Sequence, residues 1–252
     1  PDPCFTGAMA GVRLDQIMLQ RGLAESREKA QRLIVAGKVR IAGQPALKPG
    51  HTYPADTQLV LEAPERFVSR GGEKLEGALQ HFNLSVHNEV CLDIGASTGG
   101  FTDCLLQHGA RLVYAVDVGR GLLHERIRTD PRVVVMDGVN ARQLDAAAFP
   151  ERPAFATIDA AFISLKLLLP AVAGVLTRPA RLVTLIKPQF EAGRADVGKG
   201  GVVRDPAVHQ RVVEAVHAFG EQKAGLRWEG YCESPLRGPA GNIEFLAYWT
   251  TP

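Results

Sequence analysis

The chain has 252 residues, of which 46% are hydrophobic and 22% are charged, and its formal net charge is +2. This is the composition of an ordinary globular protein, with enough apolar residues for a full core in one or two domains. No apolar run approaches the roughly 18 residues of a membrane-spanning helix, and no signal peptide is evident. These features argue against stable membrane association and favour a cytoplasmic location.

The four cysteines, Cys4, Cys91, Cys104 and Cys232, form no C-x-x-C pair. Three of them lie within apparent strands or a helix, where a reduced and buried thiol is the usual state. We therefore expect neither a disulfide framework nor a metal site. The first eight residues, PDPCFTGA, look like an expression remnant and are excluded from the predicted fold.

The first quarter of the chain is more basic than the rest. Residues 12–62 hold eight Lys or Arg and five Asp or Glu, a net charge of +3, so the remaining residues total −1. A basic module on a neutral body is typical of nucleic-acid binding, although a solvated surface explains so small an asymmetry about as well.

Residue periodicity predicts a small α+β module at the N-terminal end. Apolar residues spaced for a helix occupy 13–22, and Ser26 is a typical N-cap for a second helix that ends at Gly37. Residues 39–41 and 58–61 alternate as strands. The module, a short linker and the remaining body are predicted over residues 9–63, 64–70 and 71–252.

A glycine-rich turn organises the body. The apolar run 90–94 precedes this turn, and residues 101–107 follow it as an expected helix. Strand, glycine turn and helix form the nucleotide-binding arrangement of doubly wound sheets. The spacing here is D-x-G-x-x-x-G-G, with Asp93 two residues before Gly95. A carboxylate at that position would repel a pyrophosphate and suits a cationic ligand, such as the amine of a methionine group.

A second acidic residue, Asp117, ends the next apolar run, residues 112–116. An acid at the end of the second strand is placed to bind ribose hydroxyls. A ribose and a cationic group without a diphosphate indicate S-adenosylmethionine. The alternative is a plain strand–helix–strand unit that binds no ligand.

Polar residues end five successive predicted strands. Because these ends meet at the carboxyl edge of a parallel sheet, their side chains are expected to line one crevice. The turn at Asp137-Gly138 is placed to hydrogen-bond an adenine. The five residues are Asp93, Asp117, Asp137, Asp159 and Lys187.

The fold class expected from this alternation is α/β. We predict a Rossmann-like, doubly wound and mostly parallel sheet with an antiparallel edge, preceded by the small α+β module. In the helix expected over residues 165–176, Pro170 would introduce a kink. The other strands and helices of the body are predicted over residues 132–136, 154–158, 182–186, 227–233, 243–249, 73–82 and 205–224.

The N-terminal module resembles a known RNA-binding family. It contains RLDQIMLQRGLAESREKAQRLIVAGKVRIAG, which is similar to the module first seen in small-subunit ribosomal protein four. The resemblance implies that its basic helices contact phosphates of structured RNA. The candidate RNA contacts are Arg13, Ser26, Arg27, Lys29, Arg32, Lys38 and Arg40.

The body contains FVSRGGEKL, CLDIGASTGGFTDCLLQHGA, AVDVG, TIDAAFISL, LIKPQFE and SPLRGPAGNIEFL. These motifs resemble the FtsJ-type ribose 2'-O-methyltransferases. With the N-terminal module, they resemble the TlyA family of ribosomal RNA methyltransferases and haemolysins. The resemblance implies S-adenosylmethionine-dependent methylation of ribose, in cytidines of ribosomal RNA or of ribosomal subunits.

The resemblance also implies a Lys-Asp-Lys-Glu catalytic set at Lys74, Asp159, Lys187 and Glu244. The expected cofactor-binding residues are Asp93, Gly95, Ser97, Thr98, Gly99, Phe101, Asp117, Asp137, Gly138 and Asp159.

This reaction would move a methyl group from a sulfonium to a ribose 2'-oxygen, so alignment and the removal of one proton are its main tasks. Lys187 is the candidate nearest the 2'-hydroxyl. It acts either as a neutral amine that accepts the proton or as an ammonium that orients the oxygen. Asp159 is expected to orient Lys187, and Glu244 to pair with Lys74.

Two other classes of function are alternatives to this interpretation. One is a non-catalytic protein that binds RNA or assists ribosome assembly, which the intact catalytic set argues against. The other is a membrane-active haemolysin, which the lack of a long apolar segment argues against.

Residues 193–200, GRADVGKG, nearly match the phosphate-binding motif G-x-x-x-x-G-K-[ST]. Gly200 stands where the motif needs Ser or Thr, so a nucleotide triphosphatase is rejected. A basic loop over the substrate crevice is expected instead, with Arg194, Lys199 and Arg204 meeting RNA phosphate.

Overall fold

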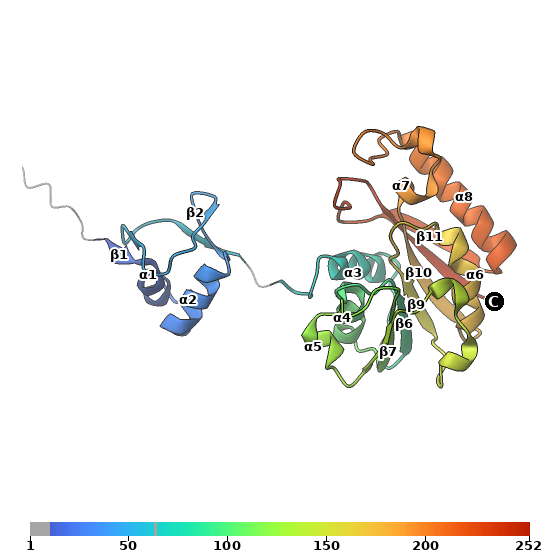
Figure 1. The fold of residues 1–252 in the computed structure, drawn as a ribbon, viewed down its shortest axis with the longest axis horizontal. Helices are drawn as coiled ribbons and strands as arrows, with labels where there is room; N and C mark the ends of the chain where they lie inside the picture. The colour runs from blue at the N-terminus through green and yellow to red at the C-terminus, as the bar shows by residue number, and fades with distance from the viewer. Residues whose placement is uncertain (1–10, 63–64) are drawn as a thin grey trace, which may run out of the picture. The chain divides into compact units, whose positions relative to one another are not determined.

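The structure, a computed structural model, describes residues 11–62 and 65–252 of the chain. The chain divides into two compact units, shown in Figure 1, and the larger unit is Glu65–Pro252. The predicted expression remnant with Cys4, and the predicted boundary residues 9, 63 and 64, lie outside the described residues.

The smaller unit packs two helices against short antiparallel strands. The helices are α1 (Leu14–Gln20) and α2 (Arg27–Val35), and Ser26 caps α2 by accepting a hydrogen bond from the Lys29 amide at 3.2 Å. Apolar residues at helical spacing on both helices form the core of this unit. Its paired strands are β1 (Val12–Arg13) with β4 (Thr52–Tyr53), and β2 (Val39–Ile41) with β3 (Gln44–Pro45) and β5 (Leu59–Leu61).

A buried carboxylate, Asp15, joins two of the predicted RNA contacts. It accepts hydrogen bonds from Arg13 at 3.1 and 2.9 Å, from Gln31 at 2.8 Å and from Arg27 at 3.0 Å. The hydrogen bond from Arg13, with those from Gln31 and Arg27, holds the pKa of Asp15 well below its usual range. Arg13 and Arg27 therefore have a structural partner apart from any RNA.

We expect Asp15→Asn to lower the free energy of unfolding of the smaller unit by about 2 kcal/mol, because two half-exposed arginines lose their anionic partner. Amide hydrogen exchange in α1 and α2 should become faster. The matched control is Asp56→Asn, which changes an exposed carboxylate of the same unit. Equal exchange rates in the two variants would contradict the expectation.

The larger unit is built on a seven-stranded sheet with the order β11-β12-β10-β9-β6-β7-β8. Neighbouring strands from β10 to β8 are parallel, and β12 pairs antiparallel with β10 and with β11. The predicted α/β class with an antiparallel edge is confirmed. The strands are β6 (Val90–Ile94), β7 (Leu112–Asp117), β8 (Val133–Asp137), β9 (Phe155–Ile158), β10 (Ala180–Ile186), β11 (Arg227–Glu233) and β12 (Phe245–Thr251).

Helices cover both faces of this sheet, as a doubly wound fold requires. In Figure 1, α3, α4 and α5 lie on one face, and α6 and α8 lie on the other. Each face has its own apolar core, which includes Leu75 and Leu105 on the first and Leu169 and Trp249 on the second. The helices are α3 (Gly71–His81), α4 (Gly100–Gln107), α5 (Glu125–Arg128), α6 (Leu169–Val175), α7 (Pro188–Glu191) and α8 (Pro206–Ala224).

One helix prediction is wrong in detail. The helix expected over residues 165–176 is divided into a 3-10 turn, Leu165–Leu167, and α6. Pro170 lies in the first turn of α6, where its missing N–H would have had no helical partner. Pro170 therefore begins a helix and does not kink one.

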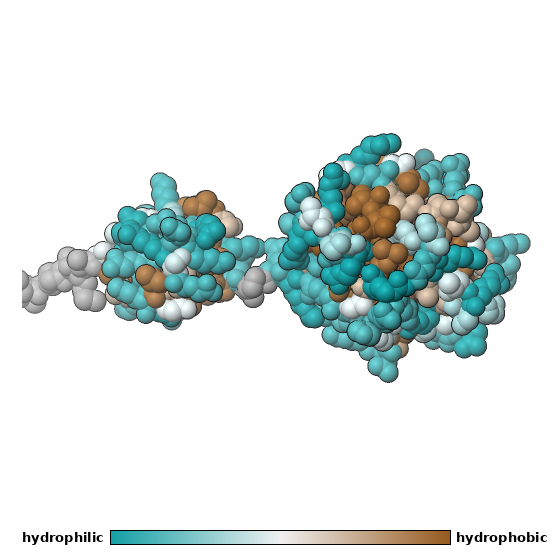
Figure 2. All heavy atoms as spheres, turned by 90° about the horizontal axis from the view of Figure 1, so that it is seen from below, coloured by the Kyte–Doolittle hydropathy of each residue, from teal (hydrophilic) through white to brown (hydrophobic). Residues whose placement is uncertain are grey.

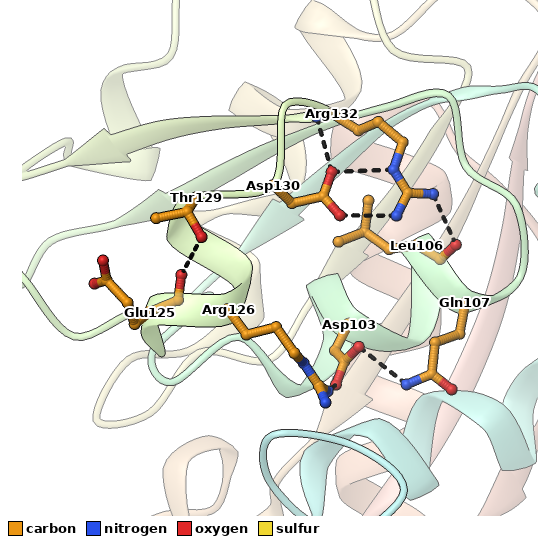
Figure 3. Close-up of polar contacts among 8 residues, drawn as sticks. All are labelled: Asp103, Leu106, Gln107, Glu125, Arg126, Thr129, Asp130 and Arg132. Atoms are coloured by element: carbon orange, nitrogen blue, oxygen red, sulfur yellow. Dashed lines mark hydrogen bonds and ion pairs between the residues drawn. The ribbon is translucent and has the colours of Figure 1, made fainter.

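The predicted linker residues 65–70 belong to the larger unit and pack against it. Phe67 is 3% exposed. The Val68 amide donates a hydrogen bond to Asp103 on α4 at 2.8 Å. Figure 3 shows Asp103 also bound to Arg126 of α5, at 2.5 Å. The segment is therefore held by both apolar packing and a buried carboxylate.

Within residues 11–62 and 65–252, no helix is both long and apolar enough to cross a membrane. Figure 2 shows a hydrophobic patch on the larger unit, bordered in part by hydrophilic residues. Contiguous apolar surface on a globular domain often marks a binding site.

Candidate active site

The glycine turn brings the ends of two strands together. Gly95 has a φ of +79°, and a Cβ on this residue would lie 2.4 Å from the backbone oxygen of Asp159 at the end of β9. Only glycine allows both the left-handed backbone and so close an approach. The turn that follows β6 is thus pressed against the residue that follows β9.

Asp93 differs from its expected role as a direct ligand. Its side chain is fully buried and accepts hydrogen bonds from the hydroxyls of Thr102 at 2.6 Å and Thr157 at 2.9 Å. Burial raises the pKa of Asp93 to about 6. Its carboxylate lies beneath the glycine turn and joins β6 to α4 and β9, so it supports the turn from inside.

The raised pKa of Asp93 predicts a pH-dependent stability. Because the folded state holds this proton more tightly than the unfolded chain, the free energy of unfolding should fall as pH rises from about 4 to about 6, by up to about 3 kcal/mol. Asp93→Asn should lack this contribution. Urea unfolding followed by tryptophan fluorescence reports the larger unit, because Trp228 and Trp249 both belong to it. A wild type and variant with the same pH dependence would exclude the effect.

Asp117 lies at the carboxyl end of β7, as expected. Its carboxylate accepts hydrogen bonds from the amides of Ser97 at 2.8 Å and Gly119 at 2.7 Å. Each carboxylate oxygen keeps a free lone pair, so Asp117 can still accept from the hydroxyls of a ribose.

Two cavities meet at the glycine turn and share Gly95, Ser97, Asp159 and Ala161. The larger cavity has a volume of about 580 Å³ and is bordered by Asp117. The smaller has a volume of about 320 Å³. Apolar side chains that line the larger cavity are those of Ile94, Val116, Val118, Leu122, Val139, Phe162, Ile163 and Leu168.

The expected catalytic set is brought together in the smaller cavity. Lys74, Asp159, Lys187 and Glu244 all line it, although they come from α3, from the ends of β9 and β10 and from the residue before β12. Lys74 Nζ lies 2.5 Å from Glu244 Oε2, and Lys187 Nζ lies 2.5 Å from Asp159 Oδ1. The set is therefore two adjacent ion pairs.

The two pairs differ in burial. The Lys74 and Glu244 side chains are 11% and 1% exposed, whereas those of Lys187 and Asp159 are 12% and 22% exposed. A buried ion pair is retained only where both charges have good partners, because removing one leaves the other uncompensated. Lys74 and Glu244 thus form the inner pair, and Lys187 and Asp159 form the outer pair, whose carboxylate is the more exposed one.

The predicted cofactor residues divide into two groups. Gly99 packs against Leu123 and Ile127, and Asp137 accepts a hydrogen bond from the Gly121 amide at 2.9 Å. These two residues border neither cavity, and the same holds for Asp93 and Gly138. The predicted residues that do border them are Gly95, Ser97, Thr98, Phe101, Asp117 and Asp159.

In place of Asp137 and Gly138, the loop after them borders the larger cavity. Its lining residues are Val139, Asn140, Ala141 and Arg142. The side-chain amide of Asn140 and the apolar Val139 and Ala141 suit a planar base better than the carboxylate of Asp137 does. An adenine contact by Asp137 and Gly138 stays a prediction.

Phe162 is a site residue that the sequence did not single out. It is 90% exposed, has a φ of +63° and borders the larger cavity. Its ring lies 5.1 Å from that of Phe190. Glu191 fixes the same loop by accepting hydrogen bonds from Ser164 Oγ and the Leu165 amide, both at 2.6 Å. An exposed aromatic held in a strained backbone next to Asp159 is suited to stack on a base.

The basic loop at residues 193–204 lies outside both cavities. Arg194, Lys199 and Arg204 are all exposed. The loop is held from below by the buried Asn242, which bonds to the Val203 amide and to the Gly201 carbonyl, both at 2.9 Å. An RNA contact by these three cations stays a prediction.

In the smaller unit, four of the predicted RNA contacts are in ion pairs and one is a helix cap. Arg13 and Arg27 pair with Asp15, and Arg40 pairs with Glu62 at 2.5 Å. Lys38 lies 3.8 Å from Glu62. The side chains of Lys29 and Arg32 are the candidates with no ion pair within the described part of the chain.

The cavity pair fits an adenosyl ligand with a cationic tail. The larger cavity offers an apolar lining with Asp117 at the end of β7 and Asn140 in the loop after β8. The smaller offers the backbone of the glycine turn and Asp159. The size of the larger cavity and its mostly apolar lining are typical of small-molecule sites. Sheet, glycine turn and strand-end acids together define a Rossmann-like methyltransferase class.

The comparisons with known proteins agree with this class. The FtsJ-like methyltransferase family matches residues 67–250, and the S4 domain family matches residues 12–59. The chain therefore belongs to the FtsJ-like methyltransferase family, which makes it an enzyme of the methyltransferase class, and it has an S4 domain at its N-terminal end.

Relatives match the chain across both units. It is 48% identical to the 16S/23S rRNA (cytidine-2'-O)-methyltransferase TlyA of Mycobacterium tuberculosis, over 95% of this chain and 90% of that protein. It is 42% identical to Hemolysin A of Brachyspira hyodysenteriae, over 94% and 99%. A solved structure, "Putative hemolysin from Streptococcus thermophilus", is 47% identical with a TM-score of 0.74, over 97% of this chain and 90% of that one. The expected TlyA relationship is confirmed.

Proposed function

We propose that this protein transfers a methyl group from S-adenosylmethionine to the 2'-oxygen of a ribose, in a cytidine of ribosomal RNA. The observation that carries the proposal is the pair of joined cavities, one suited to an adenosyl group and the other lined by both ion pairs of the catalytic set. The substrate is taken from the relatives, which include a protein named as an rRNA cytidine-2'-O-methyltransferase.

The residues that would hold the cofactor come from three strand ends. Asp117 would accept from the ribose hydroxyls, the apolar lining with Asn140 would hold the adenine, and the glycine turn at Gly95 and Ser97 would border the methionine part. When bound, S-adenosylmethionine supplies an electrophilic methyl group. The turn is shaped by its glycines and by the buried Asp93.

The outer ion pair performs the proton transfer in this proposal. For this step Lys187 must first release the proton it holds in the ion pair to solvent; the neutral amine then accepts the proton of the 2'-hydroxyl at Nζ, and Asp159 orients the amine and stabilises the ammonium that forms again. The inner pair, Lys74 with Glu244, holds the opposite wall of the smaller cavity in place. Because the alcohol is a poor nucleophile, its alignment by these fixed groups contributes much of the rate.

Substrate selection would fall to other surfaces. The S4 domain would contact the phosphates of structured RNA through cations such as Lys29 and Arg32, and Phe162 would stack on the base of the target nucleotide. Because ribosomes are assembled in the cytoplasm, we place the protein there.

The experiment is transfer of labelled methyl from S-adenosylmethionine to purified small subunits, large subunits and intact ribosomes. Label that survives base removal and maps to a ribose would support the proposal and identify the substrate particle. Cofactor binding without transfer to any particle would oppose it. Absence of cofactor binding would favour a non-catalytic RNA-binding role.

A further inference from the structure

Two arginines border the smaller cavity beside the catalytic set. Arg70 is the N-cap residue of α3, and Arg237 lies in the loop between β11 and β12. Both are exposed, and across residues 11–62 and 65–252 neither side chain makes a hydrogen bond or an ion pair. By contrast, Arg66 pairs with Glu76 at 2.5 Å. Two guanidinium groups therefore remain available at the cavity mouth.

Each of the two arginines lies close to one member of the inner ion pair. Arg70 precedes Lys74 by four residues, which is about one helical turn, so both lie on the same side of α3. Arg237 precedes Gly238, where an added Cβ would lie 2.4 Å from Glu244 Oε1. The arginines thus reach the cavity from two different elements that Lys74 and Glu244 tie together.

The loop that carries Arg237 has a fixed backbone. The Gly238 amide donates to the carbonyl of Asn242 at 2.9 Å. Asn242 is 1% exposed and its side chain is anchored by Val203 at 2.9 Å. Arg237 is therefore presented from a rigid turn, which lowers the entropy cost of ordering it around a ligand.

The charged residues that line the smaller cavity favour the binding of an anion. Its ionisable lining is four cations and two carboxylates, and both carboxylates are already paired with lysines. The two unpaired charges are those of Arg70 and Arg237. A guanidinium binds a phosphate with two parallel hydrogen bonds, which suits it to a nucleic-acid backbone.

We propose that Arg70 and Arg237 form a subsite for the RNA phosphates that flank the methylated ribose. The 2'-oxygen and the 3'-phosphate of a nucleotide are bonded to adjacent ribose carbons. A phosphate must therefore lie beside the catalytic set whenever the 2'-oxygen does. This subsite rests on the proposed function, and it positions the acceptor ribose without touching the reacting atoms.

The test compares Arg237→Ala and Arg237→Lys with the control Arg178→Ala, which changes an exposed arginine just before β10, at the opposite end of the strands. Binding to purified ribosomal subunits is measured across a range of KCl concentrations, together with KM and kcat for methyl transfer and the affinity for S-adenosylmethionine. Arg237→Ala should raise KM for the subunit about tenfold and reduce the salt slope of binding by about one, with cofactor affinity unchanged. Arg237→Lys should recover most of the slope.

Tryptophan fluorescence checks that each variant is folded. A KM and salt slope equal to those of Arg178→Ala would overturn the subsite, and so would a matched loss of cofactor affinity. A wild type that binds subunits but transfers no methyl group would refute the proposed function alone, since the salt slopes still decide whether Arg237 contacts phosphate.

Discussion

Lys187→Ala should lower the rate of methyl transfer at least about a thousandfold and leave the affinity for S-adenosylmethionine within about twofold. Lys187 Nζ is 2.5 Å from Asp159 in the outer pair, and the variant removes the group that accepts the 2'-hydroxyl proton. Single-turnover transfer to ribosomal subunits measures the rate, and equilibrium dialysis measures the cofactor affinity.

The matched control for this variant is Lys223→Ala, an exposed lysine in the last turn of α8 that borders neither cavity. Its rate should equal that of the wild type. Near-wild-type transfer by Lys187→Ala would refute the assigned proton acceptor. Loss of both transfer and cofactor binding would show that Lys187 shapes the cofactor cavity and does not act in the chemical step.

Glu244→Ala should be both inactive and unstable. It leaves the ammonium of Lys74, which is 11% exposed, without its anionic partner in a buried position. We expect the free energy of unfolding of the larger unit to fall by about 3 kcal/mol, and methyl transfer to fall at least about a hundredfold. Urea unfolding followed by tryptophan fluorescence and the transfer assay measure the two effects.

A double variant separates stability from activity. Lys74→Met with Glu244→Leu replaces the inner pair with apolar groups, so it should recover most of the lost stability. It should remain as inactive as Glu244→Ala, because no charge then holds the wall of the cavity. Glu233→Ala, which changes an exposed carboxylate at the end of β11, is the control. A stable and active double variant would show that the inner pair has no part in the reaction.

Local patterns in the sequence predicted most elements of the larger unit. The alternation of apolar runs with helical periodicity predicted a parallel sheet, and polar residues at strand ends predicted a crevice. The structure has these strands within one or two residues of their predicted ends. The strands of two residues, such as β1 and β4, were not predicted, because so short a pairing leaves no periodic signal.

Burial explains the main departures from the expected site. Asp93 and Asp117 look alike in the sequence, since each ends an apolar run before a glycine. The structure seals Asp93 beneath the turn with Thr102 and Thr157, and leaves Asp117 at the cavity edge. Which acid is covered depends on the helix that packs over the strand end, and no short motif encodes that.

The sequence by itself determined the order of strands and helices and the glycine turn, because these follow from periodicity and spacing along the chain. The candidate catalytic residues came from the resemblance to FtsJ-type methyltransferases, and their roles stay predictions. The pairings of Lys187 with Asp159 and of Lys74 with Glu244 were also expected, and the tertiary structure decided how deeply each pair is buried. Lys74 on α3 and Glu244 just before β12 are 170 positions apart, and the packing of α3 against β12 brings them within 2.5 Å. Arg237 and Phe162 become site residues for the same reason: their access to the cavities depends on packing between distant segments, which sequence spacing does not record.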